Sequence, residues 1–375
     1  MKHLEPQAAI ADVRADGVTV WVSTQTPVRI RTAVAKAIDR KEDEVIVKPV
    51  YLGGGVGRKI DESAAVEAAR LSAAIGKPVH IGWNRSEDFL NGFMRPPTHN
   101  RLLASVDNKG FIQAIEHQQA SGEVAFPFFP DVAKVVMGAD FGSWRGAYLH
   151  YAADQKQTTT WLADLPVPTG WWRGLGVLPN VFAIESFIDE LAHSIGMDPL
   201  EFRILNRPMN ELGDRVENVL KEVAKLSSWY ERNKGIGKGI AWSSDVNTVV
   251  AEVAEIHIEE GIIKVDKIYA VVDPGLVISP DGAKAQALGA ITMGLSAVLK
   301  EKVTLKNGKL VQTNFHNYPL LTMQEAPEIE IKMISSGETP FGMGEPPIAP
   351  VGAAVANAVF DLTGKRIRQL PLKLS

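Results

Sequence analysis

Hydrophobic positions in the first 80 residues change between strand-like and helix-like spacing. Val18–Ser23 is β-branched and aromatic, which predicts a strand. Apolar residues from Pro27 onward recur at helical spacing, and Val45–Val50 predicts a buried strand. The glycine-rich run Gly53–Gly57 follows at once, and a further helix is predicted directly after it, ended by Gly76.

The middle of the chain predicts a hairpin, a region of loops and two helices. Alternating apolar residues over Arg101–Glu123 flank a turn at residues 108–110 and predict the hairpin. Pro127–Pro168 has weak periodicity and is interpreted as loops and short strands. Val181–Ser194 predicts a helix, and Asp198-Pro199 predicts the N-cap and first residue of the next.

The second part of the chain begins with a polar helix predicted over Asp214–Leu226 and a glycine-rich stretch, where we place a domain boundary. Strand and helix patterns alternate beyond it. One further short strand is predicted earlier in the chain, at Val79–Trp83. The sequence therefore predicts an α+β fold of two mixed α/β domains, residues 1–213 and 214–375. The later elements are strands at Ile240–Trp242, Val249–Ile258 and Ile262–Val272, a hairpin turn at Asn307-Gly308, and helices at Gly282–Lys300 and Ile348–Thr363.

Composition narrows the possible functions. The 375 residues carry a formal net charge of −4, so no basic excess favours nucleic-acid binding. The chain contains no cysteine, which excludes disulfides, thiolate zinc sites and cysteine-ligated iron–sulfur clusters within it. The first ten residues, from Met1, do not resemble an export signal, and no apolar run is long enough for a membrane helix. These features predict a soluble protein.

The glycine run has two interpretations. Four glycines in five positions permit positive φ and let backbone N–H groups approach a ligand, which favours a cradle for a large anionic cofactor. The alternative is a tight turn without a ligand. Neither a dinucleotide fingerprint nor a phosphate loop fits, because Arg58 stands where each motif needs another residue.

Three other places carry candidate chemistry. Gln25 follows the first strand, where its amide could bind an oxygen ligand or simply be a solvated turn residue. The run Trp171–Gly176 offers an arginine that could bind an oxyanion, or only a surface loop with an aromatic anchor. Glu345 either interacts with the dipole of the next helix or is a general base held by surrounding glycines and prolines. The histidines show no metal-ligand spacing.

In order along the chain, nine segments resemble the molybdenum-binding subunit of the molybdenum hydroxylases, the xanthine dehydrogenase and aldehyde oxidase superfamily. The likeness is greatest to the isoquinoline 1-oxidoreductase β-subunit branch and covers nearly the whole chain. The segments are Glu5–Gln7, Ser23–Gln25, Gly53–Lys59, Arg173–Asn180, Glu185–Ala192, Asp198–Arg203, Asn314–Leu320, Gly344–Pro350 and Thr363–Pro371.

The resemblance implies a role for each matching residue. Glu345 corresponds to the general base that deprotonates the attacking hydroxyl, and Gln25 to the amide that binds an oxo ligand. Trp171 and Trp172 correspond to residues of the substrate pocket. The implied cofactor is molybdopterin with molybdenum held by the pterin, which in bacterial relatives is usually the cytosine dinucleotide form. The residues implied to lie beside that cofactor are Gln25, Gly54, Gly55, Val56, Gly57, Arg173, Gly174, Leu175 and Gly344.

Three departures from the family pattern matter. Many relatives have an aromatic residue where Val56 stands, and xanthine-type relatives have another where Leu175 stands. The Gly-Gln-Gly motif by which the isoquinoline branch grips the pterin does not occur in this chain. The resemblance therefore implies one half of a split large subunit, incomplete without a partner chain that supplies the other half.

The implied function is that of a molybdenum hydroxylase subunit that oxidises an aldehyde or an N-heterocycle with water as the oxygen source. Electrons would leave through a small iron–sulfur subunit, consistent with the absence of cysteine. The implied location is the cytoplasm, or the periplasm if a partner carries a twin-arginine signal. The alternative is a non-catalytic scaffold or binding subunit that keeps the fold and binds no molybdenum.

Overall fold

The computed structural model describes residues 4–129 and 131–374, so Met1 lies outside the described part. The chain forms two compact units that are interleaved along the sequence. The first contains residues 1–95, 165–173 and 303–318, and the second contains 96–164, 174–302 and 319–375. Each unit therefore draws on both sides of residue 213. The division into cofactor-binding domains at that residue stays a prediction.

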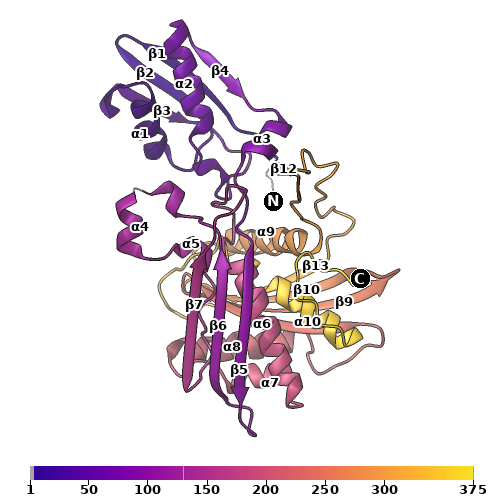
Figure 1. The fold of residues 1–375 in the computed structure, drawn as a ribbon. Coiled ribbons are helices and arrows are strands. Elements are labelled where there is room, and N and C mark those ends of the chain that lie inside the picture. The colour runs from indigo at the N-terminus through magenta and orange to yellow at the C-terminus, as the bar shows by residue number, and fades with distance from the viewer. Residues whose placement is uncertain (1–3, 130, 375) are drawn as a thin grey trace. The chain divides into compact units, whose positions relative to one another are not determined.

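The first unit is built on a four-stranded sheet whose strand order is β3-β2-β1-β4 (Figure 1). Alternate residues of β1 and β2 are buried beneath two helices, as period-two patterning requires. The sheet contains β1 (Ala8–Arg14), β2 (Gly17–Val22), β3 (Val45–Pro49) and β4 (Val79–Gly82), and the helices are α1 (Pro27–Ala37) and α2 (Ser63–Ile75).

The prediction of a buried strand at Val45–Val50 is wrong in its burial. Strand β3 pairs with β2 on one side only and lies at the edge of the sheet. Its Val45 is buried, but Ile46 is 57% exposed because it points away from the helices. A short apolar run alone does not distinguish an edge strand from a central one.

Short elements complete the first unit. Phe89 in α3 packs edge-on against Phe315 and Tyr318, with ring centroids 5.6 and 5.5 Å away, which ties the segment 303–318 to the rest of the unit. The predicted hairpin at Asn307-Gly308 is present. These elements are η1 (Glu42–Glu44), η2 (Arg58–Ile60), α3 (Arg85–Asn91), β11 (Leu305–Lys306) and β12 (Lys309–Leu310).

A three-stranded sheet, ordered β5-β6-β7, opens the second unit. The predicted hairpin is confirmed as β5 (Thr98–Val106) and β6 (Ile112–Ser121), and β7 (Gln155–Leu162) pairs parallel to β6. The interpretation of Pro127–Pro168 as loops and short strands missed two helices, α4 (Asp131–Met137) and α5 (Phe141–Trp144).

The carboxylate of Asp140 explains why periodicity missed α5. It accepts hydrogen bonds from the backbone N–H groups of Val124, Ala125 and Phe126, next to the turn η3 (Phe126–Phe128), and from Gly142 at the start of α5. One buried side chain thus organises this region, and such an interaction leaves no repeating pattern in the sequence.

A second sheet, ordered β13-β10-β9-β8, forms the centre of the second unit (Figure 1). Residues Val249, Ala251 and Val253 pack with α8, whereas Ala254 and Ile256 pack with α9 and α10. The sheet is therefore covered on both faces. Its strands are β8 (Gly237–Asp245), β9 (Thr248–Glu259), β10 (Ile262–Asp273) and β13 (Glu328–Met333); the helices are α6 (Val177–Ser194), α7 (Pro199–Leu205), α8 (Glu211–Leu226), α9 (Pro280–Leu299), η4 (Pro346–Ile348) and α10 (Val351–Thr363).

The glycines at the start of strand β8 have a packing role that the sequence did not indicate. A Cβ at Gly239 would lie 2.1 Å from the backbone nitrogen of Ala358 in α10. Strand β8 and helix α10 therefore approach each other backbone to backbone.

Among the described residues, no helix is both long and apolar enough to cross a membrane.

Candidate cofactor and catalytic site

The glycine run of the first unit lies close to other chain segments at Gly53, Gly55 and Gly57. Gly57 has φ of +95°, and a Cβ there would lie 2.7 Å from the carbonyl oxygen of Trp171. A Cβ at Gly55 would lie 2.7 Å from Cδ of Gln25. Only glycine fits these positions without displacing a neighbour, so the run is built to bring backbone close to Gln25 and Trp171.

Hydrogen-bond donors remain available around this run. Oε1 of Gln25 accepts a hydrogen bond of 2.9 Å from the backbone N–H of Gly57. Its Nε2 donates to no other residue in the described part of the chain, and neither do the backbone N–H groups of Gly54, Gly55 and Val56. Three backbone donors on one short stretch, together with the amide of Gln25, suit a ligand rich in oxygen atoms.

Val56 joins the glycine run to the tryptophan–arginine loop. Its carbonyl oxygen accepts a hydrogen bond of 2.9 Å from the N–H of Arg173. Val56 itself has φ of +44°, which is a genuine outlier for a β-branched residue. Strain of this kind persists only where surrounding structure imposes it and is concentrated at functional sites. In the second unit Leu175 also has a positive φ, of +34°.

A buried lysine directly after the glycine run connects it to the residues around Glu5 and Ser23. Lys59 is fully buried and donates to the carboxylate of Glu5 at 3.2 Å, the carbonyl of Pro6 at 2.9 Å and Oγ of Ser23 at 3.0 Å. Glu5 also accepts a hydrogen bond from the N–H of Gly53. Burial raises the pKa of Glu5, but the hydrogen bonds from Ser23, Gly53 and Lys59 outweigh it and the net pKa is lowered.

Glu345 lies in the second unit, at the start of η4. Its side chain makes no capping hydrogen bond to the backbone of that turn. Instead Oε1 accepts a hydrogen bond of 3.0 Å from the backbone N–H of Gly174, and Oε2 forms an ion pair with Arg145. The side chain is 27% exposed. A carboxylate held at both oxygens and still reached by solvent suits a positioned base.

Sequence reasoning missed Arg145 and its second partner, Asp245. The Nε and Nη2 atoms of Arg145 each lie 2.6 Å from a different carboxylate oxygen of Asp245. Burial lowers the pKa of Arg145, but the contacts with Asp245 and Glu345 together raise it by more than burial lowers it, so the net pKa is raised. Burial raises the pKa of Asp245, and Arg145 offsets only part of that effect. No motif in the sequence distinguishes this arginine from others.

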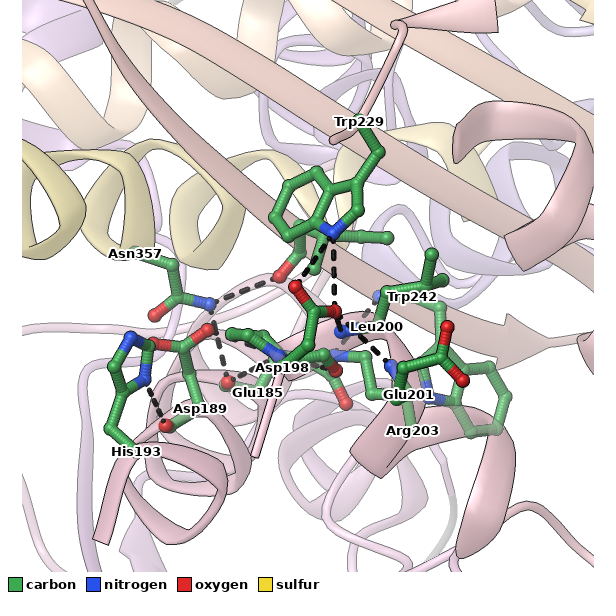
Figure 2. A network of polar contacts seen from close by, with 12 residues as sticks. Glu185, Asp189, His193, Asp198, Leu200, Glu201, Arg203, Trp229, Trp242 and Asn357 are labelled. Carbon is green, nitrogen blue, oxygen red and sulfur yellow. Dashed lines mark hydrogen bonds and ion pairs between the residues drawn. The ribbon is translucent and has the colours of Figure 1, made fainter. Parts of the chain in front are cut away.

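A buried polar network fixes helix α6, which begins two residues after Leu175 (Figure 2). Glu185 accepts hydrogen bonds from Nε of Arg203 at 2.9 Å, the backbone N–H of Trp242 at 3.1 Å and the hydroxyl of Tyr151 at 2.6 Å. The network thereby joins α6 to α7 and to β8. It holds in place the helix from which the Gly174–Leu175 turn extends.

The structure brings the predicted residues together in two groups, one in each unit. Gly54 and Gly344 stand apart from close packing, because a Cβ at either position would meet no atom within 4 Å. Trp172 is buried. Among the described residues, no cluster of three or more His, Cys, Asp or Glu side chains could hold a metal ion. The first group contains Gln25, Gly55, Val56, Gly57, Trp171 and Arg173, and the second contains Gly174 and Glu345.

Comparison with known families identifies the chain. A family model described as a molybdopterin cofactor-binding domain matches residues 1–207, and a second model with the same description matches residues 207–327. The chain belongs to the molybdopterin cofactor-binding domain family. The resemblance to the molybdenum hydroxylases that the sequence indicated is therefore confirmed.

Individual relatives agree with this family. The chain is 32% identical to the isoquinoline 1-oxidoreductase subunit beta of Brevundimonas diminuta over 99% of its length and 48% of that protein. It is 30% identical to a membrane-bound aldehyde dehydrogenase (pyrroloquinoline-quinone) of Gluconacetobacter polyoxogenes over 99% of its length and 51% of that protein. The chain thus spans about half the length of these curated relatives.

A solved structure supports the fold. Quinoline 2-oxidoreductase from Pseudomonas putida 86 superposes with a TM-score of 0.85 at 16% sequence identity, covering 98% of this chain and 73% of that one. The predicted mixed fold of the molybdenum-binding large-subunit type is thereby confirmed.

Proposed function

We propose that this chain is the catalytic part of a molybdenum hydroxylase that oxidises an aldehyde or an N-heterocycle with water as the oxygen source. The single observation that supports it best is the placement of Glu345, whose carboxylate is held at one oxygen by Gly174 and at the other by Arg145. That Glu345 corresponds to the base of the family is proposed from the resemblance of its segment. In the net reaction a substrate C–H and water become C–OH, with release of two electrons and two protons.

The residues of the first unit fit a molybdopterin. Gln25 and the backbone of Gly54, Gly55 and Val56 offer hydrogen-bond donors that no described residue uses, and a Cβ at Gly54 would meet nothing within 4 Å. These residues would hold the cofactor. The same role for Gly57, Arg173, Gly174, Leu175 and Gly344 is proposed from the family resemblance alone. When bound, the molybdenum pterin accepts the electron pair removed from the substrate.

This chain's own residues would then perform two tasks. Glu345 takes a proton from the attacking water-derived hydroxyl, a step for which a positioned carboxylate is suited. Trp171 and Trp172 form part of the wall against which a flat substrate lies. Residues 1–213 are proposed as the first cofactor-binding domain, which is partial, and residues 214–375 as the second cofactor-binding domain. The cytosine dinucleotide form of the pterin is proposed from the resemblance alone.

Partner chains follow from two observations. Ile46 is an exposed apolar side chain on the edge strand β3, and Val50, Tyr51 and Leu52 are exposed directly after that strand, an arrangement typical of a covered surface. The chain contains no cysteine, so an iron–sulfur cluster that receives the electrons must be bound elsewhere. We therefore propose assembly with a polypeptide that completes the large subunit and with a small iron–sulfur subunit.

Glu345→Gln in the purified native assembly tests the proposal. General bases contribute about 10²–10⁴-fold, so kcat should fall by about that factor while molybdenum content per chain stays at the wild-type level. Glu338→Gln is the matched control, because Glu338 is exposed on the same loop, and it should leave kcat unchanged.

Two results would overturn the proposal. A fully active Glu345→Gln enzyme would remove the base from the mechanism. Elemental analysis that finds no molybdenum in the native assembly would favour the non-catalytic scaffold, and pyrroloquinoline quinone found in its place would indicate the chemistry named for the Gluconacetobacter relative.

A further inference from the structure

We propose that Arg145 is a positioning residue for Glu345 and that Asp245 holds Arg145 in place. The inference rests on the proposed role of Glu345 as the base. It concerns three side chains that are distant in sequence, since Arg145 lies 100 residues before Asp245 and 200 before Glu345. They come from the end of α5, the end of β8 and the start of η4.

Arg145 is fixed by a two-point contact with Asp245. The two carboxylate oxygens of Asp245 face Nε and Nη2 at 2.6 Å each, a side-on geometry that orients the planar guanidinium. Asp245 is only 6% exposed, so the pair is largely removed from water. The remaining terminal nitrogen, Nη1, then points to Oε2 of Glu345. The direction of that nitrogen is set by Asp245 and not by solvent.

Glu345 is in turn held at two points. Arg145 occupies one lone pair of Oε2, and the N–H of Gly174 occupies one lone pair of Oε1 at 3.0 Å. Each oxygen of a carboxylate has two lone pairs, so one on each oxygen stays available to accept a proton. The arrangement fixes the plane of the carboxylate without consuming its capacity as a base.

The charges of the cluster favour the same conclusion. Arg145 is the cation that contacts both carboxylates, and burial together with the negative charge of Glu345 raises the pKa of Asp245. Without Arg145 two carboxylates would face each other in a partly dry site, and like charges at short range repel. Loss of Arg145 should therefore turn Glu345 away from Gly174 as well as remove a hydrogen bond.

Arg145→Met and Arg145→Lys in the native assembly test this role. Displacing a reacting group by about 1 Å can cost about 10²-fold in rate, so Arg145→Met should lower kcat by roughly 10- to 100-fold with KM nearly unchanged. Arg145→Lys should recover part of kcat, because lysine keeps the charge but lacks the planar fork. Arg207→Met is the control, since Arg207 forms a comparable ion pair, 2.7 Å from Glu217, and should leave kcat unchanged.

A second readout does not depend on activity. At one fixed pH, water-soluble carbodiimide with an amine nucleophile labels accessible carboxylates, and mass spectrometry of the Glu345 peptide gives the labelling rate. That rate should rise several-fold in Arg145→Met and stay at the wild-type level in Arg207→Met. Asp245→Asn keeps a hydrogen-bond partner for Arg145 and should raise the labelling rate less.

The outcomes separate this inference from the proposed function. Unchanged labelling and unchanged kcat in Arg145→Met would overturn the positioning role. If Arg145→Met does not fold, unchanged labelling and kcat in Asp245→Asn and Arg145→Lys would overturn it equally. An active Glu345→Gln enzyme would instead refute the proposed base, whereas the labelling rates would still report whether Arg145 holds that carboxylate.

Discussion

The backbone N–H of Gly174 donates a hydrogen bond of 3.0 Å to Oε1 of Glu345, across 171 positions of sequence. Gly174 has φ of +89°, and a Cβ at this position would lie 2.8 Å from Cγ2 of Ile348. The same glycine therefore contacts the carboxylate and the turn η4 that carries it. Its lack of a side chain is what allows the N–H to reach Glu345.

Gly174→Ala is expected to lower kcat strongly and to lower the thermal stability only modestly. The added methyl group would push against Ile348 and lengthen the hydrogen bond to Glu345, so kcat should fall by roughly 10-fold or more, as expected for a misplaced catalytic group. Steady-state kinetics and thermal unfolding of the same preparation check this. Gly196→Ala is the control: Gly196 has φ of +69° but open space around it, so it carries the strain without the collision.

Periodicity predicted most of the fold correctly. The helices α2 and α9, the hairpin of β5 and β6, and the strands β9 and β10 all match the predicted ranges within a few residues. Their burial follows from repeating patterns that a sequence displays directly. What periodicity could not predict was α5, which depends on one buried aspartate, and the edge position of β3, which depends on the strand order.

The candidate site was predicted unevenly for a similar reason. Glu345 and Gly174 lie in segments that resemble the family, and the structure brings them into contact. Arg145 and Asp245 belong to no such segment, and they are linked to Glu345 only by the tertiary fold. An ion pair between residues 100 positions apart has no signature in a single sequence.

Gly57→Ala is expected to impair cofactor retention. Gly57 has φ of +95°, which disfavours any residue with a side chain. The substitution would also place a methyl group 2.7 Å from the carbonyl oxygen of Trp171, and a backbone atom cannot move aside cheaply. The loop should shift and its free N–H donors with it, so molybdenum per chain should fall well below the wild-type level. Elemental analysis of the purified assembly measures this.

Gly76→Ala provides the comparison for that measurement. Gly76 ends α2 in the same unit with φ of +63°, and a Cβ there would meet no atom within 4 Å. It should cost about 1 kcal/mol of stability through backbone strain and leave the molybdenum content unchanged. Equal molybdenum content in both variants would show that the glycine run does not hold the cofactor.

Glu252 is a buried carboxyl group that no described hydrogen-bond donor contacts. It lies on β9, is fully buried, and neither of its carboxylate oxygens has a hydrogen-bond partner among the described residues. Burial raises its pKa well above the ordinary value of 4.5. The folded protein therefore holds a proton on Glu252 at pH values where the unfolded chain has released it.

This difference sets the direction of a pH effect. Above pH 4.5 the folded state binds more protons at Glu252 than the unfolded state, so this residue makes the free energy of unfolding fall as pH rises toward the folded pKa. The slope is at most about 1.4 kcal/mol per pH unit. Glu252→Gln keeps the shape without the titration, so its stability advantage over wild type should grow with pH.

Urea unfolding of wild type and Glu252→Gln at pH 5, 6.5 and 8 measures that advantage. Glu259→Gln is the matched control, because Glu259 lies on the same strand with its side chain 64% exposed, and it should show no growing difference. A Glu252→Gln advantage that is equal at pH 5 and pH 8 would mean that Glu252 stays ionised in the fold. Ionisation would in turn require a cation or water inside the sheet, since no described side chain donates to it.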